Sequence, residues 1–220
     1  MLNTSKTIFV SSKLQYNCCI FVEKSDKMIN TVAVYCASST KIKPCYFKAA
    51  ERLGEIFAMN HIRCCNGAGN MGLMAAVSNA VLANGGNVTG VIPRFMCEQG
   101  WQHKGLTDLE IVDTMHERKL RMMQLSDAAV ALPGGCGTLE ELFEVITWKQ
   151  LGLYLKPIVI VNVENFYTPL LNYLEQLIDG QFMRPIHRDI WTVIDSPEDI
   201  MQAFKDAKPW DAGVRKNAAI

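Results

Sequence analysis

The sequence predicts an α/β domain that is doubly wound: a mostly parallel sheet of about seven strands with helices on both faces. Two observations predict it. From Thr31 onward, short runs rich in β-branched residues alternate with longer stretches of helical periodicity. The run Ile158-Val159-Ile160-Val161 is apolar throughout, which is typical of a strand that is buried on both faces. Strands that alternate with helices in this way favour a parallel sheet.

Each expected element follows from its local pattern, taken in chain order. The apolar runs predict strands at residues 31–36, 62–65, 87–92, 109–112, 128–132, 157–162 and 191–194. The helical periodicity between them predicts helices at residues 44–59, 72–84, 114–126, 138–152, 166–179 and 197–207.

The chain has 220 residues, which fits one globular domain with a sizeable core. Residues 1–28 lack clear periodicity and precede the first strong strand, so we expect an N-terminal appendage there. The folded domain is expected over residues 29–207, and residues 208–220 read as a loose C-terminal tail.

Composition excludes several classes of protein. The chain has 22 basic and 22 acidic side chains, and this balance argues against a protein that coats polymeric nucleic acid. Its apolar runs fall short of the roughly 20 residues that cross a membrane. The eight cysteines show no Cys-x-x-Cys pair, and neither they nor the four histidines have the spacing of a metal site. We therefore expect a cytoplasmic protein with reduced thiols and no metal.

The first glycine-rich junction follows the strand at residues 62–65. The segment Asn66–Gly72 formally matches Gly-x-Gly-x-x-Gly, a pattern that lets backbone N–H groups approach a phosphate. No convincing acidic residue ends the next strand to hold a ribose, so a dinucleotide fingerprint is the weaker interpretation. A tight turn with close helix–sheet packing and a mononucleotide loop both remain open.

The second junction, Pro133–Glu141, is the stronger one, because a buried strand leads into a proline, three glycines and a helix. We expect Thr138 to be the N-cap residue and Glu141 to complete a capping box. The alternative is functional: the glycines and the helix dipole form an anion site, beside which a carboxylate orients water or stabilises positive charge.

The helix at 114–126 carries a second candidate residue. Thr114 and Glu117 have the spacing of a capping box, and helical periodicity places Arg118 on the same face as Met122. A charge on an apolar face is unfavourable unless it is paired or lines a pocket, so Arg118 is a candidate anion-binding residue. A buried structural salt bridge is the alternative for Arg118, and Lys119 reads as a solvated neighbour.

Two further residues near this edge have open interpretations. Trp148 lies off the apolar stripe of its helix, which indicates either a subunit interface or the covering of a loop. Cys136 lies at the expected helix N-terminus, but no histidine is placed to activate it as a nucleophile. We therefore expect Cys136 to fill a small slot and not to act as a nucleophile.

These motifs resemble the LONELY GUY family of cytokinin-activating phosphoribohydrolases. Pro133–Glu141 matches the family's Pro-Gly-Gly-x-Gly-Thr-x-x-Glu signature, and residues 115–119 match its second block. Shorter matches lie at residues 35–39, 72–74, 91–93 and 147–152. The likeness covers roughly residues 31–205, so it extends over nearly the whole expected domain.

The resemblance implies a Rossmann-like, homodimeric nucleotide-binding phosphoribohydrolase domain. It implies a hydrolase that cleaves the N-glycosidic bond of a nucleoside 5′-monophosphate, either AMP or N6-modified AMP, to a free base and ribose 5-phosphate without a cofactor. By resemblance, Arg118 and Glu141 are the catalytic residues. The substrate-binding residues that it implies are Lys119, Gly134, Gly135, Cys136, Gly137, Thr138, Leu139, Glu140, Thr147, Ser38, Gly69, Met115 and Glu98.

The chain departs from the family's pattern at two positions. Ala37 and Ala68 stand where the family usually has glycine, and each adds a methyl group near the expected ligand. The identity of the base is therefore left open. Two other functions are also weighed: a nucleotide-binding module without chemistry, and the pyridoxal-dependent lysine decarboxylase whose name family members have carried. No lysine has a local sequence context that supports a Schiff base.

Overall fold

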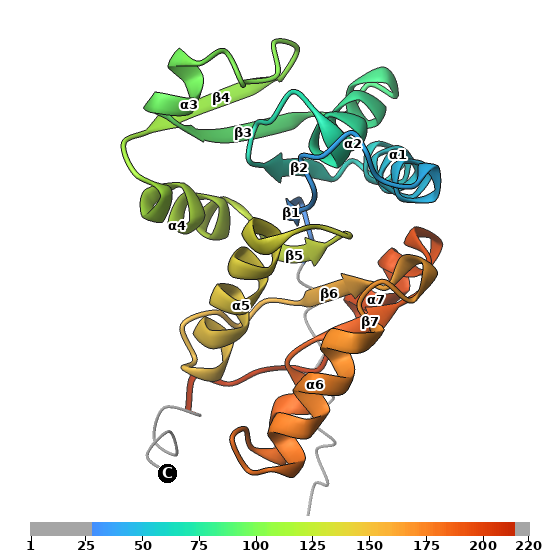
Figure 1. Cartoon of the computed structure of the whole chain (residues 1–220), viewed down its shortest axis with the longest axis vertical. Helices are drawn as coiled ribbons and strands as arrows, with labels where there is room; N and C mark the ends of the chain where they lie inside the picture. Colours follow the sequence, from blue (N-terminus) through green and yellow to red (C-terminus); the bar gives the residue numbers. More distant parts are fainter. Residues whose placement is uncertain (1–27, 214–220) are drawn as a thin grey trace, which may run out of the picture.

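The structure of the protein is a computed structural model that describes residues 28–213. Almost all of the appendage expected at residues 1–28 therefore lies outside the described residues. Within them, seven parallel strands form one sheet in the order β4-β3-β2-β1-β5-β6-β7 (Figure 1). The strands are β1 (Thr31–Tyr35), β2 (Arg63–Asn66), β3 (Val88–Pro93), β4 (Asp108–Val112), β5 (Ala128–Ala131), β6 (Ile158–Val161) and β7 (Thr192–Ile194). The predicted doubly wound α/β fold is confirmed.

Helices connect successive strands. The helices are α1 (Pro44–Met59), α2 (Gly72–Ala83), α3 (Arg94–Glu98), α4 (Met115–Leu125), α5 (Cys136–Gln150), α6 (Thr168–Asp179) and α7 (Ile200–Asp206). Short 3₁₀ segments occur at η1 (Val163–Asn165), η2 (Pro185–Asp189) and η3 (Pro197–Asp199). The short helix α3 was not predicted, and α7 is shorter than expected because η3 takes up its first turn.

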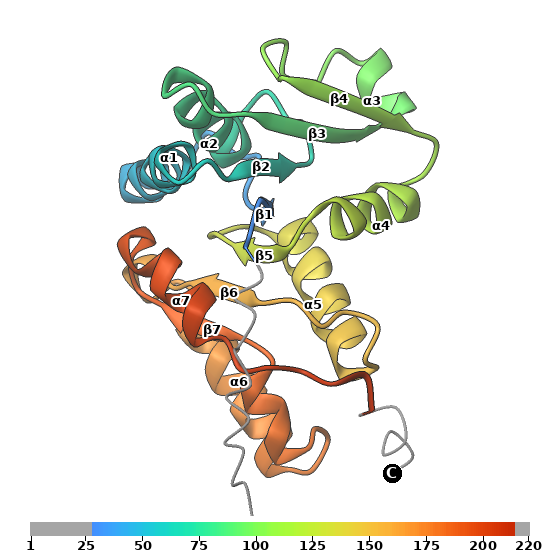
Figure 2. The same ribbon diagram turned by 180° about the vertical axis from the view of Figure 1, so that it is seen from behind.

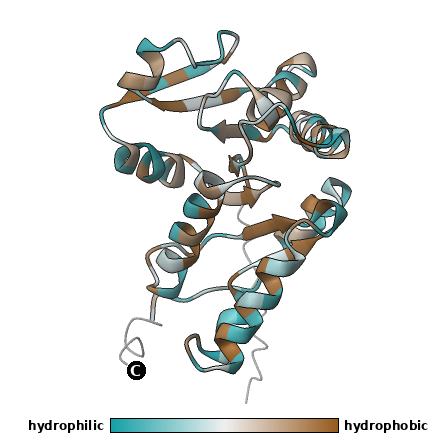
Figure 3. Ribbon diagram, in the orientation of Figure 1, coloured by the Kyte–Doolittle hydropathy of each residue, from teal (hydrophilic) through white to brown (hydrophobic). Residues whose placement is uncertain are grey.

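The sheet separates two apolar layers. Along β1, Val32 and Val34 face a cluster that includes Phe57 of α1, whereas Ala33 and Tyr35 face the cluster on the other side. Helices α1, α2 and α7 cover the first face, and α4 and α5 contribute to the second, as the two opposite views show (Figures 1 and 2). Strand β6 is hydrophobic along its length, as its buried position requires (Figure 3).

The packed part of the chain extends past the boundary expected at residue 207. Trp210 lies in the segment that reads as a loose tail, yet only 8% of it is exposed. Its indole Nε1 donates a hydrogen bond of 2.6 Å to the carbonyl of Lys149 at the end of α5. Apolar burial and a satisfied indole N–H therefore attach this segment to the second face of the sheet.

Strand β1 marks the point where the order of strands reverses. The chain runs outward from β1 through β2, β3 and β4, and then returns to place β5 on the other side of β1. In an open parallel sheet, such a reversal opens a crevice at the carboxyl ends of the strands, where ligands bind. The fold therefore directs attention to the residues that follow β1, β2 and β5. No helix within residues 28–213 combines the length and the apolar character that crossing a membrane requires.

Candidate active site

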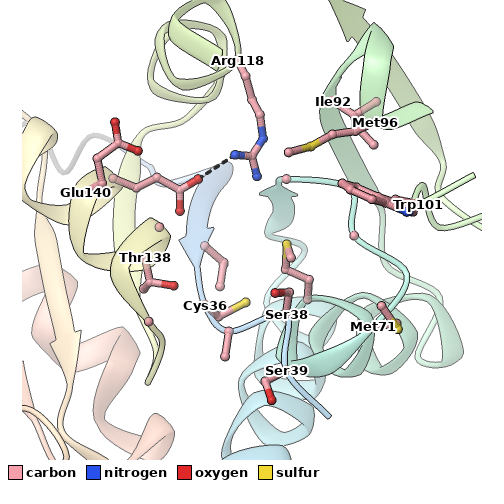
Figure 4. Close-up of a pocket in the computed structure, with 18 of the residues that line it drawn as sticks. Cys36, Ser38, Ser39, Met71, Ile92, Met96, Trp101, Arg118, Thr138 and Glu140 are labelled. Carbon is pink, nitrogen blue, oxygen red and sulfur yellow. Dashed lines mark ion pairs between the residues drawn. The ribbon is translucent and has the colours of Figure 1, made fainter. Parts of the chain in front are cut away.

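A cavity of about 590 Å³ opens at this reversal point, between the segments that follow β1, β2, β3 and β5 (Figure 4). Ten of the expected site residues line it: Ser38, Gly69, Met115, Arg118, Gly135, Cys136, Gly137, Thr138, Glu140 and Glu141. The two glycine-rich junctions, far apart in the sequence, therefore meet at one cavity.

Arg118 of α4 and Glu141 of α5 form a buried ion pair at the cavity (Figure 4). Their Nη1 and Oε1 atoms are 3.1 Å apart, and the two side chains are only 10% and 9% exposed. The Nε of Arg118 also donates a hydrogen bond, of 3.2 Å, to the carbonyl of Val91. The sequence left two interpretations of Arg118 open, a buried salt bridge and a residue that lines a pocket. The structure shows both features together, because the buried salt bridge lies at the cavity.

Burial determines the protonation behaviour of Glu141. Removal from water raises the pKa of this carboxyl to about 7, although the positive charge of Arg118 lowers it in part. An ordinary glutamate is fully ionised at neutral pH. Glu141 therefore gains or loses its proton near neutrality, a property that is common in catalytic carboxyl groups.

Helix α5 begins two residues earlier than expected, which corrects the prediction for Thr138. The N-cap residue is Gly135, without a side-chain cap, and Thr138 lies inside the first turn, where it is buried. A Cβ at Gly134 would lie 2.1 Å from Oγ1 of Thr138, so the glycine lets the chain turn closely over it. Glu141 is one turn further along and does not cap its own helix; it pairs with Arg118 instead.

The first turn of α5 leaves open space beside its backbone. A Cβ added at Gly135 or Gly137 would meet no atom within 4 Å, so the protein's own packing does not require glycine there. The first N–H groups of a helix have no partner within it, and together with the helix dipole they attract anions. Exposed Cys136 lies between these glycines, at the rim of the cavity. This end of the cavity suits a phosphate group.

The other glycine-rich junction combines a close approach with a turn. A Cβ at Gly67 would lie 1.6 Å from Nη2 of Arg118, so the guanidinium lies directly against this glycine. Gly72 has φ +62°, and a Cβ there would lie 2.4 Å from the backbone of Ser38. The tight-turn interpretation is thus confirmed at Gly72, while Gly67 and Gly69 line the cavity.

An apolar wall faces the α5 end of the cavity. Met71, Met96 and Trp101 lie across the cavity from Thr138 and Glu140 (Figure 4). Their segments are joined by backbone hydrogen bonds, including one of 3.0 Å from the N–H of Asn70 to the carbonyl of Trp101. The sequence analysis missed this wall, because residues 94–103 reach the first junction only through tertiary contacts.

The other five expected site residues do not line the cavity. Glu98 is exposed at the end of α3, and the hydroxyl of exposed Thr147 donates to the carbonyl of Phe143. Gly134 precedes the lining residues of α5 and Leu139 lies among them, but neither residue lines the cavity. Lys119 is not the solvated neighbour that its position indicated. It is 6% exposed, and its Nζ pairs with carboxylates of α5.

The capping box at the start of α4 is confirmed. The N–H of Glu117 donates to Oγ1 of Thr114 at 3.1 Å, and the N–H of Thr114 donates to Oε2 of Glu117 at 3.2 Å. This box fixes the first turn of α4, the turn that presents Arg118 to the cavity. Residues 28–213 hold no group of three or more His, Cys, Asp or Glu side chains arranged to bind a metal ion.

Known proteins resemble this chain in sequence. A family model described as "Possible lysine decarboxylase" matches residues 74–204. The cytokinin riboside 5′-monophosphate phosphoribohydrolase LOG5 of Arabidopsis thaliana is 38% identical over 83% of this chain and 80% of its own length. The cytokinin riboside 5′-monophosphate phosphoribohydrolase of Rhodococcoides fascians is 40% identical over 80% of this chain and 89% of its own length.

Solved structures share the fold. The molybdenum cofactor binding protein of Rippkaea orientalis aligns with a TM-score of 0.63 and 18% identity, over 81% of this chain and 97% of that protein. The X-ray structure of TM1055 aligns with a TM-score of 0.62 and 21% identity, over 80% of this chain and 98% of that protein. At such low identity, these two likenesses bear on the fold alone.

Proposed function

The chain belongs to the family of cytokinin riboside 5′-monophosphate phosphoribohydrolases, and we propose that it hydrolyses the N-glycosidic bond of a nucleoside 5′-monophosphate. Water adds to C1′, the C1′–N bond breaks, and the products are the free base, which takes up a proton, and ribose 5-phosphate. The observation that carries this proposal is the buried pair of Arg118 and Glu141 beside the open first turn of α5.

Glu141 is the residue that we assign to the reacting carbon. Cleavage of a glycosidic bond develops positive charge on the sugar, and a carboxylate in a low-dielectric site stabilises that charge. The same carboxylate orients the attacking water. A pKa of about 7 lets Glu141 ionise near neutral pH while it remains buried.

Arg118 and the start of α5 position the substrate. The free N–H groups around Gly135, Cys136 and Gly137 are proposed to bind the 5′-phosphate, for which the open space beside the two glycines leaves room. Arg118 pairs with Glu141 from the opposite helix and binds an anionic or electron-rich part of the substrate. Holding the sugar at both ends brings C1′ to the carboxylate, and such positioning lowers the barrier.

The composition of the apolar wall favours a substrate whose adenine base carries an N6 substituent. With the phosphate at α5, the base points toward Met71, Met96 and Trp101, which offer a thioether and indole surface. Such side chains bind a planar base and a branched apolar chain better than they bind a bare amino group. We therefore propose N6-modified AMP of the cytokinin type as the preferred substrate and AMP as a weaker one.

A homodimer in the cytoplasm completes the proposal. Leu120 of α4 and Leu151 at the end of α5 are 41% and 44% exposed, on helices that flank the site, and they provide an apolar surface for a second copy. Six cysteines within the described residues are free thiols, as in a reducing compartment. Light scattering tests the dimer, for which it should give twice the chain mass of 24.6 kDa.

A lysine decarboxylase, the activity that the family model's description suggests, has less support from this site. A pyridoxal enzyme needs a lysine at its active centre. The residues that line the cavity include no lysine, and Lys119 beside it is held by two carboxylates. A module that binds nucleotides without chemistry remains the second alternative, but binding alone gives no reason to bury Glu141 next to an anion site.

One assay tests the proposed function. Purified protein is incubated separately with AMP, with N6-isopentenyl-AMP and with the matching nucleoside that lacks a phosphate, and base and ribose 5-phosphate are quantified. We expect equal amounts of the two products from both monophosphates, more from the prenylated one, and none from the nucleoside. If no monophosphate releases its base although one binds, the binding-module alternative replaces this proposal.

A further inference from the structure

Five charged side chains meet between α4 and α5. Arg118 and Lys119 are consecutive on α4, and Glu140, Glu141 and Glu144 lie within two turns of α5. Arg118 pairs with Glu141 at 3.1 Å, whereas Nζ of Lys119 lies 2.5 Å from Glu140 and 3.2 Å from Glu144. The five charges are thus divided into two separate groups between the two helices.

Lys119 is deeply buried although it does not line the cavity. Its side chain is 6% exposed, although its partners Glu140 and Glu144 are 56% and 26% exposed. Glu140 lines the cavity, and Lys119 does not. Burying an ammonium group is unfavourable unless its partners compensate, and here two carboxylates share that role.

The two carboxylates that Lys119 holds would otherwise compete with Glu141. Glu140 and Glu144 lie four residues apart on one helix, where like charges repel, and Glu141 lies between them in sequence. Without Lys119, Glu140 is the nearest unpaired anion on the same helix turn as Glu141, at the rim of the cavity that Arg118 lines. A guanidinium binds any carboxylate that its fork can reach.

We propose that Lys119 is a positioning residue: it holds Glu140 and Glu144 aside, so that Arg118 pairs with Glu141 alone. This inference rests on the proposed function, in which Glu141 acts as a carboxylate. It differs from the expectation, drawn from family resemblance, that Lys119 contacts the nucleotide. Lys119 is absent from the cavity lining, and it acts through its two carboxylate partners.

The proposal has an electrostatic consequence at Glu141. Burial raises the pKa of this carboxyl most, Arg118 and Lys119 lower it, and Glu140 and Glu144 raise it. Removing the ammonium of Lys119 therefore leaves two uncompensated anions beside Glu141 and raises its pKa further.

The remaining titratable neighbours of Glu141 do not offset this change. Tyr35 and Cys36 at the end of β1 and Tyr167 before α6 also interact electrostatically with Glu141. Burial raises the pKa of all three groups, so they stay neutral through the range in which Glu141 titrates. Burial, together with the charges of α4 and α5, thus sets the pKa of Glu141.

The test is the pH profile of kcat/KM with N6-isopentenyl-AMP. Lys119→Met should move the acid limb upward by about one pH unit, so that activity below the limb falls about tenfold and recovers at high pH. Lys119→Arg keeps the charge and should restore the wild-type limb. The double variant Lys119→Met/Glu144→Gln also removes one of the two carboxylates that Lys119 no longer holds. Its acid limb should lie between those of Lys119→Met and wild type.

Two further variants provide an independent test and a control. Glu144→Gln alone leaves Lys119 in place and should move the limb to lower pH, so the proposal stays testable even if Lys119→Met does not fold. Lys48→Met removes one exposed charge from α1 and should leave the limb unmoved. A higher KM at every pH with an unmoved limb would show that Lys119 contacts substrate, and an equal loss at all pH values would show a structural role only; either result overturns the proposal.

A measurement without turnover separates this inference from the proposed function. The ¹³C resonance of the Glu141 carboxyl, assigned by its absence in Glu141→Gln, is followed through a pH titration of the free protein. Its midpoint should rise in Lys119→Met and fall in Glu144→Gln. Should no monophosphate be hydrolysed, the proposed function fails while this titration still decides the role of Lys119; unmoved midpoints overturn the positioning role even in an active enzyme.

Discussion

The guanidinium of Arg118 lies so close to Gly67 that a single methyl group would displace it. A Cβ at Gly67 would fall 1.6 Å from Nη2 of Arg118 and 2.7 Å from its Cζ. The glycine of one junction thus gives the arginine of α4 room to meet Glu141 of α5. One contact therefore joins the two glycine-rich segments and the helix between them into a single site.

Gly67→Ala should inactivate the enzyme without unfolding it. The new methyl group forces Arg118 away from Glu141, and a misplacement of about 1 Å in an active site lowers rates about 100-fold. We expect kcat/KM to fall by at least that factor, with about 1–3 kcal/mol lost from the free energy of unfolding. Steady-state kinetics and urea denaturation measure the two effects.

Gly135→Ala is the matched control, because a Cβ there meets no protein atom within 4 Å. It should leave stability nearly unchanged and raise KM, since the methyl group enters the proposed phosphate site. Full activity in Gly67→Ala would contradict the account of Arg118.

The activity should rise with pH through neutrality. Glu141 acts as a carboxylate, and burial raises its pKa to about 7, so the protein is inactive where Glu141 holds its proton. The acid limb of kcat/KM for the free enzyme should therefore have its midpoint near pH 7. If the midpoint of the acid limb lay instead at the ordinary pKa of glutamate, about 4.3, the catalytic carboxylate would be a residue other than Glu141.

The same group should make stability depend on pH in the opposite direction. Because the folded pKa of Glu141 lies above its unfolded value, the folded state holds the proton more tightly. Its favourable contribution is fully present below the unfolded pKa and is lost as pH rises to about 7. The stability of wild type relative to Glu141→Gln should therefore fall across this window in denaturant titrations, and a rise would refute the raised pKa.

Trp101→Ala should narrow the preference between substrates. Trp101 is 49% exposed at the apolar wall, where it is proposed to contact the N6 substituent. Loss of an apolar contact of this kind changes discrimination by about 10-fold or more. We expect kcat/KM to fall for N6-isopentenyl-AMP and to change little for AMP. An equal fall for both substrates would place the substituent elsewhere.

Ala68 and Gly90 should show coupled effects on stability. Ala68 has φ 61°, a left-handed conformation that favours glycine, and its methyl group is fully buried. A Cβ at Gly90 would lie 2.6 Å from that methyl group. Gly90→Ala should therefore cost about 1–3 kcal/mol of unfolding free energy. Adding Ala68→Gly should recover part of it, whereas simple additivity in the double-mutant cycle would refute the contact.

How much the sequence predicts depends on how local each feature is. The seven strands were found because each contains a short run of apolar or β-branched residues, which is buried in the five inner strands and more exposed in the edge strands β4 and β7. The inward direction of Arg118 also followed from helical periodicity. The N-cap of α5 was predicted three residues too late, because the pattern favours Thr138 but does not show that Gly135 can take that place.

Features that depend on packing between distant segments were beyond the sequence. Lys119 reads as an exposed lysine until α5 brings two carboxylates to it. Trp101 and Met71 become neighbours only when the segment after α3 lies beside the first junction. Trp210 looked like part of a loose tail, because nothing near it in sequence shows that the Lys149 carbonyl accepts its N–H.

The central claim is that Glu141 carries the chemistry. The most direct measurement compares the release of base and ribose 5-phosphate from N6-isopentenyl-AMP by wild type and by Glu141→Gln, with binding measured by calorimetry on the same preparations. The account predicts that the variant folds, binds the nucleotide and loses turnover by a factor of about 100 to 1,000. Turnover by folded Glu141→Gln at the wild-type rate would contradict it.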